Sequence, residues 1–436
     1  MRTLARTLSL FALIACATWT ASPASAFGVI PGETGTSFDF TASAQRIDTP
    51  DGDKLLMWGY GVTGGTMQYP GPTLIVEQGV PITINLTNGL SVATSIVFPG
   101  QTGVAATGGS AGLLTSEAAP GGTVSYTFTP THAGTYMYHS GTRPELQIEM
   151  GLVGALIVRP TGFDQATNRT AYGHPDSAYD EEYLFLLSEA DPTIHHLIDL
   201  GFPDHVDNTT YFPTLWFING RNAVDTLTGD NEVTLPYQPY GSLAVTKPGH
   251  KVLLRMIGAG RDAHPLHPHG NHVTIIGRDG RMPESDPGVS GPDLAPVDYT
   301  VNVRPGATYD AIWDWTGEKL GWDVLGDPSG VDTAHTCVGG TDDFDDISHE
   351  YCPDHGKPMP VTLPSLLDVM QGGFWSGSPF LGQEGNLSPG EGGLNLFGGM
   401  FFPWHSHSEK ELTNNDIFLG GMLTFVIVVP HDAPIL

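Results

Sequence analysis

Charged residues are scarce in this 436-residue chain: Asp, Glu, Lys and Arg make up 15% of it, against about 25% in an average soluble protein. Basic residues are the scarcest, with 18 Lys and Arg against 47 Asp and Glu, so the formal net charge is −29. A surface this acidic repels phosphate backbones and anionic head groups and favours cations as partners. The composition therefore argues against nucleic-acid binding.

Long apolar runs are absent from the chain after its N-terminal segment. No later segment approaches the ~20 apolar residues of a membrane helix. The N-terminus itself is typical of an export signal. Two arginines precede an apolar stretch at 8–17, and an A-x-A cleavage motif ends at Ala26. We expect residues 1–26 to be a signal peptide and the mature protein to be periplasmic or secreted. A lipoprotein-like pattern before Cys16 offers the alternative of a lipid anchor at an outer surface.

Cysteine is also rare, with three residues in the whole chain. Cys337 and Cys352 lie in a loop-like stretch and are flanked by His335 and His355. In an exported chain such a pair is expected to form a disulfide. The flanking histidines leave a zinc-type site on the same residues as the alternative.

Helical periodicity is as scarce as charge. Alternating and β-branched runs, such as 73–77, 82–86 and 124–128, follow one another at short intervals with turn residues between them. This pattern predicts an all-β protein, either a sandwich or a Greek-key barrel.

A weak internal repeat indicates two homologous β-domains. The segment 151–158 (GLVGALIV), near the end of the first copy, is similar to 420–428 (GGMLTFVIV), near the end of the second. An insertion rich in Gly, Pro and Asp at about 325–399 is either surface decoration or a cover over the segment that follows it. The predicted units are a first domain at 36–162, a linker at 163–181 and a second domain at 182–432.

Histidines gather in two short motifs of the second domain. The segment 263–272 reads AHPLHPHGNH, and residues two apart on a strand point to the same face, so His267 and His269 project together. His405 and His407 repeat that spacing. Imidazole is a preferred ligand of copper and zinc, so the two pairs predict a metal site. The alternative is a set of surface histidines without a metal.

Together with the repeat, these motifs resemble the multicopper oxidases, a family built from cupredoxin domains, which are Greek-key β-sandwiches. The resemblance covers nearly the whole mature chain. It implies two cupredoxin-like domains and copper as the cofactor, one ion or more. The segments that match the family in order are 69–73, 134–140, 151–158, 217–221, 264–270 and 404–407.

The chain departs from the family pattern at several copper ligands. The family's first-domain H-W-H-G motif matches 97–100, which contains no histidine, and its H-S-H motif matches 139–141, which keeps one histidine of two. Its H-C-H motif matches 405–407, where Ser406 replaces the cysteine that binds type 1 copper. Glu411 stands where the second type 1 histidine is expected. A serine hydroxyl cannot replace a thiolate, so the resemblance implies no type 1 copper.

Five histidines remain at positions of the type 2 and type 3 ligands. By resemblance, His267 matches a type 2 ligand, and the type 3 ligands are matched by His139, His269, His405 and His407. In two-domain members of the family, ligands of the first domain meet ligands of the second domain of a neighbouring chain. A ligand at His139 therefore implies a homo-oligomer, expected to be a trimer.

Three further residues are candidates for the site. His264 matches a type 1 ligand; it is either a ligand of a separate weak metal site with Glu411, a support for other ligands, or a packed histidine. Glu145 and Glu411 follow the histidine motifs closely and are candidate catalytic carboxylates that move protons or orient an imidazole. The alternative for each is a solvated loop acid.

These features favour an exported copper oxidoreductase that acts on a small molecule or a metal ion, with dioxygen as a candidate co-substrate. Without a type 1 copper, the substrate would bind directly at an open copper position. Two alternatives stay open: a copper-binding protein for sequestration or delivery, and a metal-free structural cupredoxin module.

Overall fold

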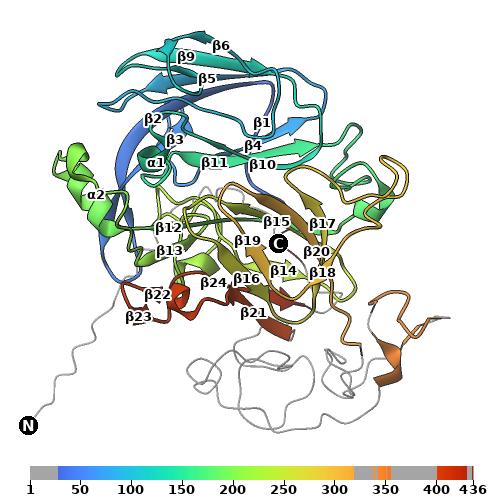
Figure 1. Cartoon of the computed structure of the whole chain (residues 1–436). Coiled ribbons are helices and arrows are strands. Elements are labelled where there is room, and N and C mark those ends of the chain that lie inside the picture. The colour runs from blue at the N-terminus through green and yellow to red at the C-terminus, as the bar shows by residue number, and fades with distance from the viewer. Residues whose placement is uncertain are drawn as a thin grey trace, which may run out of the picture.

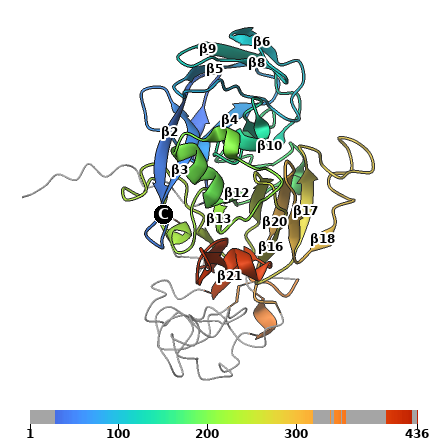
Figure 2. The same cartoon turned by 60° about the vertical axis from the view of Figure 1, so that its left-hand side comes forward.

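The computed structural model describes residues 28–318, 337–338, 342–349, 351–354, 400–429 and 435. Two β-sandwich domains lie one above the other, the first coloured blue to cyan and the second green to red (Figures 1 and 2). The predicted all-β fold of two cupredoxin-like domains is confirmed. The predicted signal peptide and most of the predicted insertion lie outside the described residues. Among the described residues, no helix is both long and apolar enough to cross a membrane.

The first domain consists of two packed sheets. One has the strand order β3-β2-β5-β9-β6, and the other has the order β1-β4-β11-β10. The strands are β1 (Glu33–Thr34), β2 (Ser37–Asp48), β3 (Lys54–Val62), β4 (Gly71–Glu77), β5 (Ile82–Asn88), β6 (Ala105–Gly108), β9 (Thr123–Phe128), β10 (Gly134–His139) and β11 (Val153–Arg159), with a short hairpin of β7 (Ser110–Ala111) and β8 (Ser116–Glu117) and one turn of helix, α1 (Pro144–Gln147).

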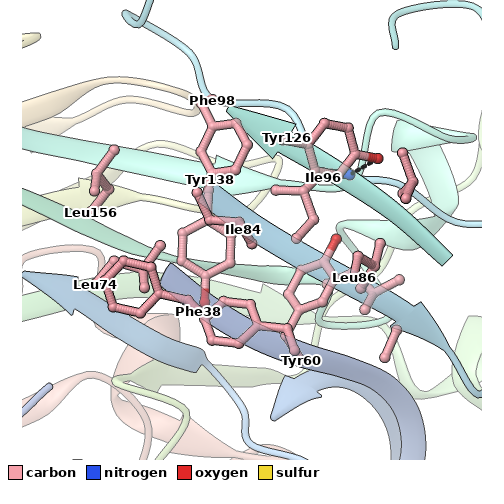
Figure 3. Close-up of a cluster of buried hydrophobic side chains, with 14 of the residues drawn as sticks. Phe38, Tyr60, Leu74, Ile84, Leu86, Ile96, Phe98, Tyr126, Tyr138 and Leu156 are labelled. Carbon is pink, nitrogen blue, oxygen red and sulfur yellow. Dashed lines mark hydrogen bonds between the residues drawn. The ribbon is translucent and has the colours of Figure 1, made fainter. Parts of the chain in front are cut away.

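Aromatic side chains fill the core of the first domain (Figure 3). The ring centroid of Phe98 lies 4.7 Å from that of Phe128. The Tyr126 hydroxyl accepts a hydrogen bond from the Ile96 N–H at 3.1 Å, and the Tyr60 hydroxyl donates to the Ser95 carbonyl at 2.7 Å. These tyrosines therefore bury their rings without losing their polar partners.

The second domain repeats the two-sheet plan. Its sheets have the orders β13-β12-β15-β20-β17-β18 and β14-β24-β21-β16-β19. The strands are β12 (Glu181–Ala190), β13 (Leu215–Ile218), β14 (Ala244–Thr246), β15 (Val252–Gly258), β16 (His264–Pro268), β17 (Val273–Arg278), β18 (Val297–Asp298), β19 (Val301–Val303), β20 (Thr308–Trp313), β21 (Met400–Ser406) and β24 (Leu423–Val428), with a hairpin of β22 (Thr413–Asn414) and β23 (Ile417–Phe418).

Short helices lie outside these two sheets. The longest is α2 (Pro192–Asp199), which follows β12 and packs against β3 of the first domain. The others are single 3₁₀ turns: η1 (Pro175–Ser177), η2 (Pro203–His205), η3 (Asp225–Leu227), η4 (Cys352–Asp354) and η5 (Glu409–Leu412).

Buried charges join the two domains. Arg255, in the middle of the fully buried strand β15, pairs with Glu182 at 2.9 Å and with Asp310 at 3.4 Å. Glu182 also accepts a hydrogen bond from Arg159 of β11 at 2.7 Å. Burial alone would raise the pKa of Glu182, but the two guanidinium groups outweigh it and lower that pKa to about 2. Since Thr135 of β10 donates to Asp310 as well, these bonds fix β10 and β11 against the second domain.

Candidate metal centre

The strands β16 and β21 bring the two histidine motifs together. They pair in antiparallel fashion with His267 opposite His405. His269 and His407 continue the strands beyond the paired residues: the His269 N–H donates to the Pro403 carbonyl at 3.1 Å, and the His407 N–H donates to the Pro265 carbonyl at 2.8 Å. The predicted convergence of the two motifs therefore follows directly from strand pairing.

His267, His269, His405 and His407 form one group, here called the four-histidine cluster. The ring of His267 has its centroid 4.6 Å from that of His269, 5.7 Å from that of His405 and 4.9 Å from that of His407. The Nε2 atoms of His269 and His405 are 3.0 Å apart. One imidazole nitrogen from each strand therefore points toward the other.

The cluster lies on the face of the sheet opposite to the hydrophobic core. Residues of β21 alternate, so Trp404 and Ser406 face the core while His405 and His407 face away from it. His405 is buried, but the side chain of His407 is 53% exposed. One member of the cluster is thus accessible from solvent.

Two rings of the cluster, those of His269 and His405, are neutral at neutral pH. Burial, followed by the charge of the neighbouring rings, lowers the pKa of His269 to about 4. Burial also lowers the pKa of His405 to about 4, against a hydrogen bond from its Nδ1 to the Ser406 carbonyl at 2.7 Å. That bond leaves the lone pair on Nε2, the arrangement of a metal-ligating histidine. The donor set therefore fits copper, which favours imidazole nitrogen.

His139 lies apart from the four-histidine cluster within one chain. It is the last residue of β10, and β10 packs against β15 and β20 of the second domain. The strands β15 and β20 belong to one sheet of that domain, whereas β16 and β21 belong to the other. Both views place β10 above the second domain's centre and β21 below it (Figures 1 and 2). Its Nδ1 contacts the Ser140 carbonyl at 2.9 Å, so Nε2 is left as the free ring nitrogen, and burial lowers its pKa.

Two residues of the first domain that depart from the family pattern, Val97 and Gly141, lie next to each other. A Cβ atom added to Gly141 would lie 2.6 Å from Cγ1 of Val97, closer than real Cβ contacts come. By the resemblance described above, Val97 and Gly141 correspond to positions where the family carries histidines. The valine thus takes up room that a second histidine at position 141 would need.

His264 is not directed at the four-histidine cluster. It is fully buried, and each ring nitrogen faces a carboxylate: Nδ1 lies 2.9 Å from Glu411 and Nε2 lies 2.8 Å from Glu189. Burial alone would lower the pKa of His264, but the hydrogen bonds to both carboxylates raise it to about 9. Of the three roles considered for His264, the structure favours a packed, charged histidine over a metal ligand.

The two candidate carboxylates differ sharply in environment. Glu145 is 47% exposed at the surface and pairs with Arg143 at 3.2 Å. Glu411 is buried and accepts a hydrogen bond from the Ser406 hydroxyl at 2.6 Å. Only Glu411 has the burial and the partners of a positioned group.

Sequence patterns missed Glu189 and Tyr211, which complete this buried network. The Tyr211 hydroxyl lies 3.0 Å from both Glu189 and Glu149. One signal was present: Glu189 is one of three glutamates in β12, a strand that also carries a run of five apolar residues, and glutamates are buried only when they are paired.

Cys337 and Cys352 are joined in the structure, with their Cα atoms 6.0 Å apart. A carboxylate oxygen of Asp345 lies within 4.8 Å of both sulfur atoms, and the same carboxylate accepts several backbone N–H bonds. The flanking histidines of the zinc alternative, His335 and His355, lie outside the described residues.

Comparisons with known proteins agree with the fold. Two family models described as multicopper oxidase match residues 59–162 and 206–313. The chain is 30% identical over 219 residues to laccase-2 of Botryotinia fuckeliana, covering 48% of this chain and 34% of the laccase. It is 30% identical over 198 residues to an iron transport multicopper oxidase of Saccharomyces cerevisiae, covering 44% and 26%.

A bacterial relative and a solved structure give a similar result. Copper resistance protein A of Escherichia coli is 31% identical over 168 residues, covering 38% of this chain and 24% of that protein. The chain thus spans about a quarter to a third of the length of these curated relatives. The crystal structure of a blue copper oxidase from Nitrosomonas europaea aligns with a TM-score of 0.55 at 18% identity, covering 90% of this chain and 86% of that one. The two family models, with the fold they describe, identify this chain as a member of the multicopper oxidase family.

Proposed function

We propose that this protein is an exported copper-dependent oxidoreductase whose copper is held by the four-histidine cluster. One observation carries the proposal: four imidazoles, of which His269 and His405 have pKa values near 4, converge from two paired strands. Neutral imidazole is the form that binds a metal. Family membership implies copper as that metal.

Copper bound there would supply one-electron chemistry toward a small-molecule or metal-ion substrate and toward dioxygen. The protein's own residues hold and orient the ligands. The Ser406 carbonyl fixes the ring of His405, and the Thr300 hydroxyl lies 2.8 Å from Nδ1 of His267. The exposed ring of His407 marks the side from which a substrate reaches the cluster.

Substrate oxidation directly at this cluster, without a type 1 copper, is part of the proposal. Ser406 supplies a hydroxyl rather than a thiolate, and that hydroxyl donates to Glu411. The ring of His264 is engaged by carboxylates on both sides. These contacts support an oxidoreductase into which electrons do not enter through a blue copper centre.

We further propose that His139 serves the cluster of a neighbouring copy in a homotrimer. Its separation from the four-histidine cluster within one chain supports this arrangement. Leu113 and Leu114, which are 88% and 57% exposed, lie in the loop beside Gly141, so apolar surface adjoins His139. A Leu113→Glu/Leu114→Glu variant is expected to run as a smaller species in analytical ultracentrifugation; an unchanged sedimentation coefficient would remove this support.

Export is the remaining part of the proposal. The N-terminal pattern supports a cleaved signal peptide, with a lipid anchor at Cys16 as the alternative.

A protein that binds copper without turnover is the second candidate function. The net charge of −29, which attracts cations, and the incomplete set of family ligands favour it.

The decisive experiment is copper per chain after loading and desalting. We expect at least one copper in the mature protein and a loss in the His405→Ala/His407→Ala variant. The matched control is His205→Ala, which removes an exposed histidine of η2 and should leave the copper content unchanged. No copper in the mature protein would exclude both copper functions. Bound copper without oxygen uptake in the presence of a reductant would favour the second candidate.

A further inference from the structure

Three residues that correspond to type 1 copper positions meet inside the second domain without a metal-binding geometry. Ser406 of β21 donates to Glu411 of η5 at 2.6 Å, and the same carboxylate oxygen lies 2.9 Å from Nδ1 of His264. The backbone holds them there, since the Met422 N–H donates to the Glu411 carbonyl at 2.8 Å. The donors present are a hydroxyl, a carboxylate and an imidazole that is already bonded on both sides, so they do not fit a blue copper ion.

The hydrogen bonds on either side of His264 indicate the protonation state of its ring. An ionised carboxylate only accepts hydrogen bonds, and His264 lies between two of them, so both ring nitrogens donate. A ring with two N–H groups is an imidazolium cation. The side chains of Glu189 and His264 are fully buried and that of Glu411 is 3% exposed, so water does not compete for these bonds.

The network continues across the domain boundary. Glu189 accepts from the Tyr211 hydroxyl at 3.0 Å and from the Asp262 N–H at 2.9 Å. The same hydroxyl lies 3.0 Å from Glu149, which follows α1 in the first domain. Arg261 stacks over the Tyr211 ring at 4.6 Å and comes within 3.6 Å of Glu149.

We propose that Glu411, His264 and Glu189 form an ionic lock in which the imidazolium takes the place of a metal ion. The lock closes this position to copper and ties β16 and β21, the strands that carry the four-histidine cluster, to β12. Through Tyr211 and Glu149 it also ties them to the first domain. His264 acts here as a positioning residue.

The lock predicts what is needed to convert the position into a metal site. A Ser406→Cys substitution supplies a thiolate, but Glu411 and Glu189 still hold the proton on the ring of His264. Adding Glu411→His removes one carboxylate, frees Nδ1 of His264 and supplies a second imidazole. A thiolate with two imidazoles is the ligand set of blue copper sites.

The first test is therefore a copper titration of Ser406→Cys and of Ser406→Cys/Glu411→His, followed by visible absorption. We expect the intense copper–thiolate band in the double variant and none in the single variant. The matched control is Ser140→Cys, which places a thiol next to His139 in the first domain, where the hydroxyl donates to Gln147 instead. A band in the single variant as strong as in the double would overturn the proposal, as would its absence from a correctly folded double variant.

A second measurement uses the unsubstituted protein and needs no copper. In metal-free protein labelled with ¹⁵N-histidine, one ring is expected to show two slowly exchanging N–H protons at neutral pH. Both signals should disappear in His264→Gln. A single ring N–H for His264 would overturn the lock, even if the cysteine variants failed to fold. Neither readout depends on the four-histidine cluster, because copper bound by imidazoles alone gives no thiolate band.

Discussion

His267 and His405 face each other across the antiparallel pair of β16 and β21, with ring centroids 5.7 Å apart. The register that places them opposite each other also places Leu266 opposite Ser406 on the core side. Because side chains alternate along a strand, a slip of one residue would exchange the two faces. The core residues Trp404 and Leu266 thus secure the register that assembles the metal ligands.

Removing one ring of this pair is expected to weaken copper binding. His267→Ala deletes the imidazole that contacts all three other members of the cluster, so copper affinity should fall at least about tenfold. The matched control is His272→Ala: this ring lies 6.1 Å from Tyr299, as that of His267 lies 6.0 Å from it, but it is outside the cluster. Competition with a chromogenic copper chelator measures both variants. Equal affinities would contradict the assignment of His267.

His264 should make protein stability depend on pH. Its folded-state pKa of about 9 lies above the unfolded value of 6.5, so the native state binds this proton more tightly. The resulting stabilisation, on the order of 3 kcal/mol, is fully present below pH 6.5 and is lost as the pH rises through about 9. Urea unfolding of the wild type and of His264→Gln at a series of pH values isolates this contribution. A difference between the two proteins that stays constant up to pH 10 would argue against a charged His264.

Removing one of the buried charges between the domains should lower the stability of the protein strongly. Glu182→Gln leaves Arg159 and Arg255 buried without their shared carboxylate, and we expect a loss of about 3–5 kcal/mol in unfolding free energy. Glu145→Gln serves as the control, because its surface pair with Arg143 should contribute no more than about 1 kcal/mol. Denaturant unfolding measures both variants. A loss at Glu182 no larger than at Glu145 would mean that these ion pairs do not hold the domains together.

The cysteine pair has two alternative roles with different mass signatures. If Cys337 and Cys352 form a disulfide in the exported protein, its intact mass should be lower by two hydrogen atoms than that of the reduced chain. Alkylation without reduction should leave both cysteines unmodified. In the zinc alternative, alkylation after chelation would modify both, and elemental analysis would find zinc.

Patterns in the sequence were sufficient for what depends on local spacing. The H-x-H pairs predicted two imidazoles on one face of each strand, and strand pairing brought His267 and His405 together. Of the two carboxylates that contact His264, such patterns could indicate only one. Glu411 follows closely after the second motif and was considered, whereas Glu189 lies 75 residues earlier and reaches His264 only through the packing of β12.

The first-domain departures show the same limit. The loss of histidines at 97–100 and at Gly141 was visible in the sequence. Val97 fills the space beside Gly141 because it forms a β-bridge with His139. The periodicity of the sequence does not predict this bridge. Likewise, the separation of His139 from the four-histidine cluster follows from how the two domains pack.

The most direct test of the central claim is the combined electron paramagnetic resonance and visible spectrum of the copper-loaded mature protein. The account predicts copper coordinated by several imidazole nitrogens, with hyperfine structure from nitrogen and no intense copper–thiolate band. Copper spectra without nitrogen coupling, or a strong thiolate band in the unsubstituted protein, would contradict it.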